Sequence, residues 1–324
     1  MTVGQLREGT AGAPSPEPLT WGSRIRYSVR IRRVEFLPVM LAIYLIPALL
    51  SVDSASTLAT GNFLLVLVMA LSIMHFIDMT NAYADRDVDA VYKARLSRSV
   101  YGLGLRNVRR QIAVTGVFVL ALATYFTIRT GNWDLLPLVA FTLYIGAGYS
   151  VPPLHLKSSG VWQMPGLAAV LIWLPMLIVV RSVPGELSWP VLAAIVGFGI
   201  NQVGIVLVNT AEDLPEDEAF GIRTCVRALG MTRAMATAVG MIAIGGSTVC
   251  LSVFAIGGPT LGMIPMVVAI GFALMHVFGT WRGVRGKSIE DALAYLRPRA
   301  KLVPLQVATT GWGTVFAAAF VLAG

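Results

Sequence analysis

Residues 81–89 read Asn81-Ala82-Tyr83-Ala84-Asp85-Arg86-Asp87-Val88-Asp89, and they directly follow an apolar run. The same frame returns in Asn209-Thr210-Ala211-Glu212-Asp213-Leu214-Pro215-Glu216-Asp217, again where an apolar run ends. Each copy has an Asn, an Asp four residues later and an Asp eight residues later. On an α-helix, steps of four residues rotate the position by only about 40°, so these three side chains share one stripe. Asp87 is predicted to point nearly the opposite way.

Carboxylates at this spacing repel one another, and a hard divalent cation that binds oxygen ligands turns the repulsion into coordination. Mg²⁺ commonly completes its shell with phosphate oxygens of a substrate. We therefore expect one metal and diphosphate site built from both copies, with the ligands Asn81, Asp85, Asp89, Asn209, Asp213 and Asp217. The alternative for a single Asp-x-x-x-Asp is a solvated helix end. Pro215 is expected to break the helix of the second copy, and Glu212, Glu216 and Glu218 are interpreted as solvated neighbours.

Outward from these motifs the chain is 56% hydrophobic and 13% charged, about half the charged fraction of a soluble domain. A bilayer crossing takes ~20 apolar residues. Runs of suitable length fall at about 35–52, 63–84, 111–128, 135–151, 161–180, 190–211, 234–257, 261–281 and 302–323. The sequence therefore predicts an all-α integral membrane protein with about nine transmembrane helices. The runs at 35–52 and 135–151 are the shortest.

The basic residues predict the orientation. If the N-terminus lies in the cytoplasm, every Lys and Arg except Arg129 and Arg181 falls on the cytoplasmic side, as the positive-inside rule requires. This accounts for the net charge of +8 without a nucleic-acid partner. We expect a protein of the cytoplasmic membrane, with its site on the cytoplasmic side of the lipid bilayer. Residues 1–22 are interpreted as a disordered N-terminal tail.

Three motifs together resemble a known family. The patterns Asn81-x3-Asp85-x3-Asp89 and Asn209-x3-Asp213-x3-Asp217-x3-Gly221-x2-Thr224 resemble the two Asp-rich motifs of the UbiA superfamily of intramembrane prenyltransferases. The segment Tyr149-Ser150-Val151-Pro152-Pro153-Leu154-His155-Leu156-Lys157 resembles the Tyr…Lys segment after that family's fourth helix. The resemblance covers roughly residues 30–324. It implies one transmembrane prenyltransferase domain over residues 23–324, with its helices arranged around a central cavity.

The resemblance implies Mg²⁺-dependent ionisation of an isoprenoid diphosphate and transfer of the prenyl group to a small acceptor, of which aromatic compounds are one class. Preorganised cations lower the barrier because charge develops on the leaving diphosphate, and a dry cavity protects the carbocation. The candidate diphosphate-binding cations are Lys93, Arg95, Lys157, Arg223 and Arg227. Lys157 and Arg223 match motif positions, whereas Lys93 and Arg95 are also explained as topology determinants.

Two residues are candidates for a direct part in the chemistry. Tyr149 has motif support and is expected to stabilise a cation through its ring. Asp78 extends the stripe of the first motif one turn deeper into the apolar run. It is expected to orient an acceptor, take its proton or steer a cation, and the alternative is a polar contact between helices.

The chain departs from the family pattern at Ala82, at Thr210 and in the sequence after the first motif, Lys93-Ala94-Arg95-Leu96-Ser97-Arg98-Ser99. Two alternatives to transfer therefore stay open. A terpene cyclase, as found within the same superfamily, would use the same ionisation without an external acceptor. A cation transporter would also carry intramembrane acids, but it predicts them near the bilayer midplane.

Overall fold

The computed structural model describes residues 20–323, and the regular structure in that range is helical, with no β-strand. The helices long and apolar enough to cross a membrane are Val34–Ser51, Gly61–Ala84, Leu105–Thr130, Gly160–Ser182, Trp189–Glu212, Met231–Gly257, Met263–Val284 and Val303–Ala323. Leu135–Ser150 is apolar but has only 16 residues. Together they correspond to the predicted runs, so the all-α membrane architecture is confirmed.

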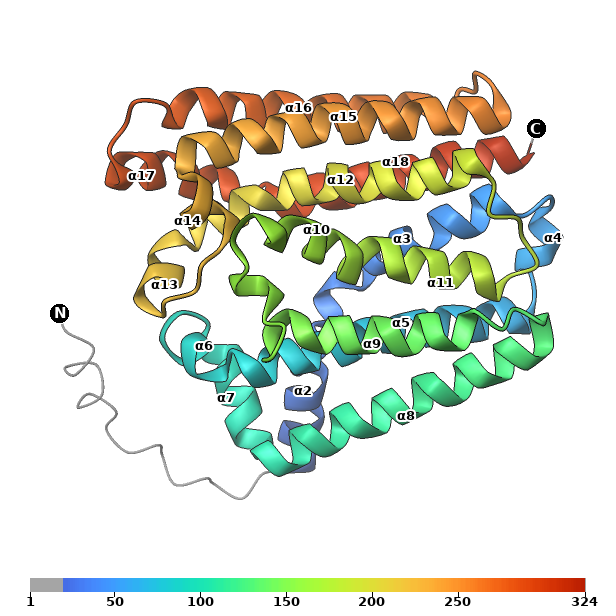
Figure 1. The fold of residues 1–324 in the computed structure, drawn as a ribbon, viewed down its shortest axis with the longest axis horizontal. Helices are drawn as coiled ribbons and strands as arrows, with labels where there is room; N and C mark the ends of the chain where they lie inside the picture. Colours follow the sequence, from blue (N-terminus) through green and yellow to red (C-terminus); the bar gives the residue numbers. More distant parts are fainter. Residues whose placement is uncertain (1–19, 324) are drawn as a thin grey trace.

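The spans carry the labels of Figure 1. In chain order they are α3 (Leu37–Ser51), α5 (Gly61–Ala84), α8 (Leu105–Thr130), α9 (Leu135–Ser150), α10 (Gln163–Ala168) with α11 (Leu174–Ser182), α12 (Trp189–Glu212), α15 (Met231–Gly257), α16 (Met263–Val284) and α18 (Val303–Ala323). A π-helical turn, Ala169–Trp173, joins α10 to α11. The shorter helices are α2 (Trp21–Ile31), α4 (Ala55–Leu58), α6 (Arg86–Tyr92), α7 (Ala94–Leu103), α13 (Leu214–Ala219), α14 (Cys225–Leu229) and α17 (Ile289–Ala300).

The predicted N-terminal tail, residues 1–22, lies outside the described residues except at its last three positions. Trp21 and Gly22 already belong to α2, and the Thr20 hydroxyl caps this helix by accepting a hydrogen bond from Ser23 N at 3.2 Å. The sequence did not predict α2 as a membrane span, because Arg24, Arg26 and Arg30 interrupt its apolar residues.

The first Asp-rich motif lies at a joint between two helices. α5 ends at Ala84 and α6 begins at Arg86, so the expected continuous helix is interrupted at Asp85. The backbone register nevertheless continues, because Asp85 N donates to Asn81 O and Asp89 N to Asp85 O, both at 2.8 Å. Asp87 points away from this stripe, as predicted, with 64% of its side chain exposed.

The second motif repeats this geometry. α12 ends at Glu212, Asp213 forms the joint, and α13 begins at Leu214 with Pro215 in its first turn, where a missing N–H is tolerated. Asp213 N donates to Asn209 O and Asp217 N to Asp213 O, both at 3.0 Å. The break that Pro215 was expected to cause between Asp213 and Asp217 lies instead at Asp213, and Leu214–Ala219 is helical. The equivalent break at Asp85, without any proline, shows that the joint belongs to the motif.

Close packing of α12 against α15 holds the second motif in place. A Cβ atom on Gly197 would lie 2.9 Å from Gly245 O, and one on Gly204 would lie 2.9 Å from Ala238 O. Small residues at these positions let the two backbones approach, as in many membrane helix pairs. In Figure 1 the helices that carry the motifs, α5 with α6 and α12 with α13, end on the same side of the bundle.

Candidate active site

A cavity of about 250 Å³ opens where α5 and α12 end. Its lining joins residues from both motifs to residues from the segment between α9 and α10. Among the predicted site residues, the structure brings together Asp78, Asn81, Asp85, Asp89, Lys93, Tyr149, Lys157, Asn209, Asp213 and Asp217. The two acidic motifs, distant in the chain, therefore face one shared space.

Three predicted cations do not line this cavity: Arg95, Arg223 and Arg227. Arg227 instead donates from Nη1 to the carbonyls of Ile222 at 2.7 Å and Asp217 at 3.3 Å, which secures the loop after α13. The main chain of Arg223 bonds to Ser158 Oγ and to Gly160 N. This pairing joins the second motif to the Lys157 segment, and a diphosphate contact by these three arginines stays a prediction.

The carboxylate of Asp85 is held tightly. Its Oδ2 accepts a hydrogen bond from Lys157 Nζ at 2.7 Å and another from Asn81 Nδ2 at 2.9 Å. Asn81 also donates to Ser150 Oγ at 2.9 Å, which ties α5 to the end of α9. Charge-assisted bonds of this length are among the stronger ones in proteins. Lys157 is presented by a 3₁₀ turn that begins after His155, whose backbone is left-handed.

The carboxylate of Asp213 is held more loosely. Lys93 Nζ lies 3.8 Å from Asp213 Oδ2, and both side chains are partly exposed. Four residues later, Asp217 is buried, as Asp89 is in the first motif. Burial raises the pKa of Asp89 to about 6 and that of Asp217 to about 6, although Lys93 and Lys157 lower both. The positive charge of the two lysines therefore does not offset the effect of burial on either carboxylate.

The donor set fits a hard divalent cation. The cavity lining has six carboxylates and three basic side chains. The neutral candidate ligands, Asn81 and Asn209, offer carboxamide oxygens. Oxygen-only sites of this kind suit Mg²⁺. Within residues 20–323 no three acids, histidines or cysteines are already drawn together as a metal-binding cluster. Lysine ammonium groups stand beside Asp85 and Asp213 as the counter-charges.

Apolar residues also form part of the cavity wall. These apolar lining residues are Ile77, Leu167, Val170, Leu171 and Val206. Tyr149 also lines it, and its hydroxyl lies 3.5 Å from Gln163 Nε2. Asp78 Oδ2 is buried and has no hydrogen-bond partner among the described residues. An unpartnered carboxylate oxygen on a cavity wall is available to a bound molecule, because burial without a partner is costly.

Among the polar residues of the lining, sequence reasoning did not assign five to the site: Arg33, Gln163, Thr210, Glu216 and Thr224. Glu216 was interpreted as solvated and Arg33 as a topology determinant, but both face the cavity. Gln163 Oε1 accepts from Cys225 N at 2.8 Å, so one amide links the Tyr149 region to α14. Thr224 is the last position of the quoted motif pattern, which is a signal that was present in the sequence. No local pattern marks Arg33 or Gln163.

Comparisons with known proteins agree with this geometry. The chain is 30% identical over 161 residues to a lycopene elongase/hydratase of Halobacterium salinarum, and the match spans 50% of this chain and 55% of that protein. A UbiA homolog from Archaeoglobus fulgidus bound to DMAPP and Mg²⁺ superposes with a TM-score of 0.64 at 18% identity, covering 89% of this chain and 98% of that one. Its complex with GPP and Mg²⁺ gives a TM-score of 0.63 at 17% identity, covering 90% and 99%. The UbiA prenyltransferase family model matches residues 37–303, and the chain belongs to this family of membrane prenyltransferases.

Proposed function

We propose that the protein catalyses Mg²⁺-dependent transfer of a prenyl group from an isoprenoid diphosphate to an acceptor dissolved in the membrane. The observation that carries this proposal is the single cavity lined by both Asp-rich motifs and by Lys93 and Lys157. The fold neighbours whose complexes contain DMAPP or GPP together with Mg²⁺ support it.

The asparagines and aspartates of the two motifs are the proposed metal ligands. The residues that would hold Mg²⁺ are Asn81, Asp85, Asp89, Asn209, Asp213 and Asp217. When bound, Mg²⁺ supplies positive charge that neutralises the diphosphate and makes it a better leaving group. Lys157 and Lys93 add positive charge next to the acids and bind diphosphate oxygens.

Bond changes follow from this arrangement. The allylic C–O bond breaks, and its electron pair leaves with the diphosphate. The apolar wall keeps water from the prenyl cation, and the Tyr149 ring faces it. π electrons of the acceptor form the new C–C bond, and the acceptor then loses a proton. Asp78 Oδ2, unpartnered on the cavity wall, accepts that proton.

Two acceptor classes remain. A small phenolic compound presents an activated ring and a hydroxyl group that Asp78 would orient. A long apolar polyene is favoured by the similarity to a lycopene elongase/hydratase, and the apolar lining formed by Leu167, Val170, Leu171 and Val206 suits it. We propose that the active site faces the cytoplasm in the cytoplasmic membrane, with the basic loops on the same side.

The test is a product assay with purified protein in lipid nanodiscs, labelled prenyl diphosphate and Mg²⁺, with lycopene or 4-hydroxybenzoate as acceptor. A prenylated acceptor, absent with EDTA and restored by added Mg²⁺, is the expected result. The Asp213→Ala variant is the control for background hydrolysis. A cyclic hydrocarbon formed without any acceptor would show that the protein is a cyclase and not a transferase. Metal flux in liposomes without diphosphate release would contradict both the transferase and the cyclase proposals.

A further inference from the structure

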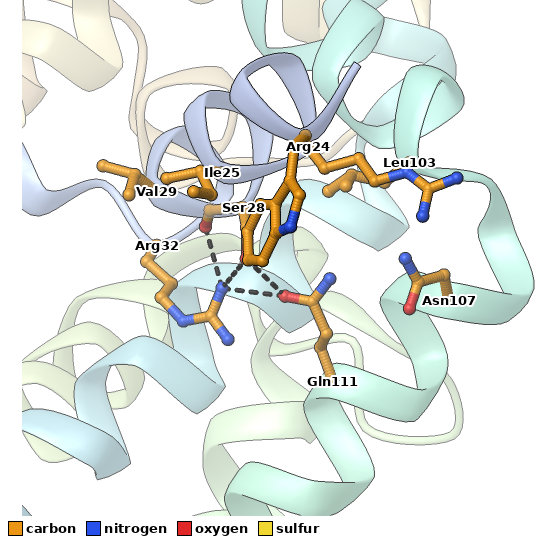
Figure 2. A pocket seen from close by; sticks show the side chains of 9 residues that line it. Arg24, Ile25, Ser28, Val29, Arg32, Leu103, Asn107 and Gln111 are labelled. Carbon is orange, nitrogen blue, oxygen red and sulfur yellow. Dashed lines mark hydrogen bonds between the residues drawn. The ribbon is translucent and has the colours of Figure 1, made fainter. Parts of the chain in front are cut away.

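A second cavity lies at the same end of the bundle, between α2 and the junction of α7 with α8 (Figure 2). Its volume is about 340 Å³. One face of α2 forms one wall, and Leu103, Asn107 and Gln111 form the other. The lining shares no residue with the active-site cavity, so the proposed reaction does not account for it.

The cavity face of α2 carries two parallel rows of side chains. Trp21, Ile25 and Val29, spaced by four residues, form an apolar row that is exposed. Arg24, Ser28 and Arg32, also spaced by four, form a polar row beside it. A helix with an apolar row beside a basic row is typical of segments that lie in a membrane interface.

A neighbouring face of α2 is fixed to the protein. Ile31 is fully buried in a cluster with Met79, Val100 and Val108, and Tyr27 packs against it. α2 is therefore anchored on one side, while its apolar and basic rows both face the cavity.

The polar part of the cavity is organised for an anion. Arg32 Nη1 donates to Ser28 Oγ at 2.6 Å and to Gln111 Oε1 at 2.8 Å, so its guanidinium is held in place. The Arg24 guanidinium has no hydrogen-bond or ion-pair partner within the described part of the chain, and Figure 2 shows it extending toward Asn107. No Asp or Glu is among the described residues of the lining. Arg106, Arg109 and Arg110 are exposed on the first turns of α8 and add positive charge nearby.

An apolar strip begins where the polar cavity ends. Gln111, Val114 and Phe118 follow one another at spacings of four, three and four residues from Asn107, so they share one face of α8. Val114 and Phe118 are exposed on this membrane-spanning helix. The basic cavity, with Trp21 in its lining, is therefore followed along α8 by an exposed apolar strip. A phospholipid has the same sequence of a charged headgroup followed by an apolar acyl chain.

We propose that this cavity binds the headgroup phosphate of an anionic phospholipid from the leaflet on the active-site side. Arg24 and Arg32 are its ligands, and one acyl chain lies along Val114 and Phe118. Arg24 contributes its hydrogen-bonding capacity to the lipid, because no group among residues 20–323 competes for it.

The test is native mass spectrometry of the full-length protein in micelles with equal amounts of phosphatidylglycerol and phosphatidylcholine of identical chains. We expect preferential retention of phosphatidylglycerol. Arg24→Gln should lower that retention roughly fivefold, Arg24→Glu should lower it further, and phosphatidylcholine should be unaffected. Arg233→Gln removes a matched exposed charge at the start of α15 and should change nothing. Because Arg24 has no side-chain partner among the described residues, its replacement is expected to leave their fold intact.

Three outcomes would overturn the proposal: unchanged phosphatidylglycerol retention in both Arg24 variants, equal retention of phosphatidylcholine, or displacement of the lipid by millimolar inorganic phosphate. The last outcome would identify a free-phosphate site instead. None of these readouts requires prenyl transfer, so the result is independent of the proposed function.

Discussion

The two Asp-rich motifs share one backbone design but differ in how firmly their first carboxylate is held. Asp85 is 14% exposed and accepts from Lys157 at 2.7 Å, with Asn81 as a second donor. Asp213 is 39% exposed, and its lysine, Lys93, lies 3.8 Å away. No side-chain hydrogen bond orients Asn209 within the described residues. The first motif is thus preorganised, and the side chains of the second are less constrained.

The strongest test of the comparison removes the carboxylate at each joint. Asp85→Ala and Asp213→Ala should each lower turnover roughly 10³-fold, because both acids are the proposed ligands of the metal that holds the diphosphate. Diphosphate release by purified protein in nanodiscs measures this. Asp87→Ala is the matched control, since that exposed carboxylate points away from the cavity. Near-normal turnover in either joint variant would contradict the assignment of metal ligands.

The two lysines should differ next. Lys157→Ala removes a short, largely buried ion pair and should raise the KM for the prenyl diphosphate about tenfold. Lys93→Ala removes a long, exposed pair and should raise it no more than about threefold. Steady-state kinetics with varied donor concentration separate the two. Equal effects on KM would mean that the lengths of the Lys157–Asp85 and Lys93–Asp213 ion pairs do not predict how strongly each lysine binds the diphosphate.

The two asparagines should differ in stability. Asn81→Ala removes hydrogen bonds to Asp85 and to Ser150 and should lower the free energy of unfolding by ~1 kcal/mol. Asn209→Ala removes no side-chain hydrogen bond to another described residue and should lower the free energy of unfolding by less than ~0.5 kcal/mol. Thermal unfolding in micelles, without Mg²⁺ so that ligation does not contribute, provides the measurement. A larger loss for Asn209→Ala would reverse the order of rigidity.

The smallest effect concerns the loop after the second motif. Arg227→Gln removes bonds to the carbonyls of Asp217 and Ile222, which should speed amide hydrogen exchange about fivefold in residues 214–224. Arg223→Gln is the control, because among residues 20–323 Arg223 makes hydrogen bonds through its main chain and none through its side chain. Equal exchange in both variants would show that Arg227 does not restrain the loop.

Much of the fold was readable locally. Spans such as α5 and α12 follow from apolar length, because lipid offers no partner for backbone groups and forces long helices. The amphipathic helix α2 was not recognised, since its arginines interrupt the apolar pattern on which the search depended. The interruption at Asp85 was also not expected, because no proline or glycine announces it.

The sequence alone determined the membrane class, the number of apolar segments and the two Asn-Asp-Asp frames, because helix length and i, i+4 spacing are local properties. Only the tertiary structure decided which cation meets which acid. Lys157 lies 72 residues from Asp85, and Arg33, Gln163 and Glu216 reach the cavity from separate elements. Such pairings depend on how helices pack, and the packing is set by contacts between segments that no local spacing encodes.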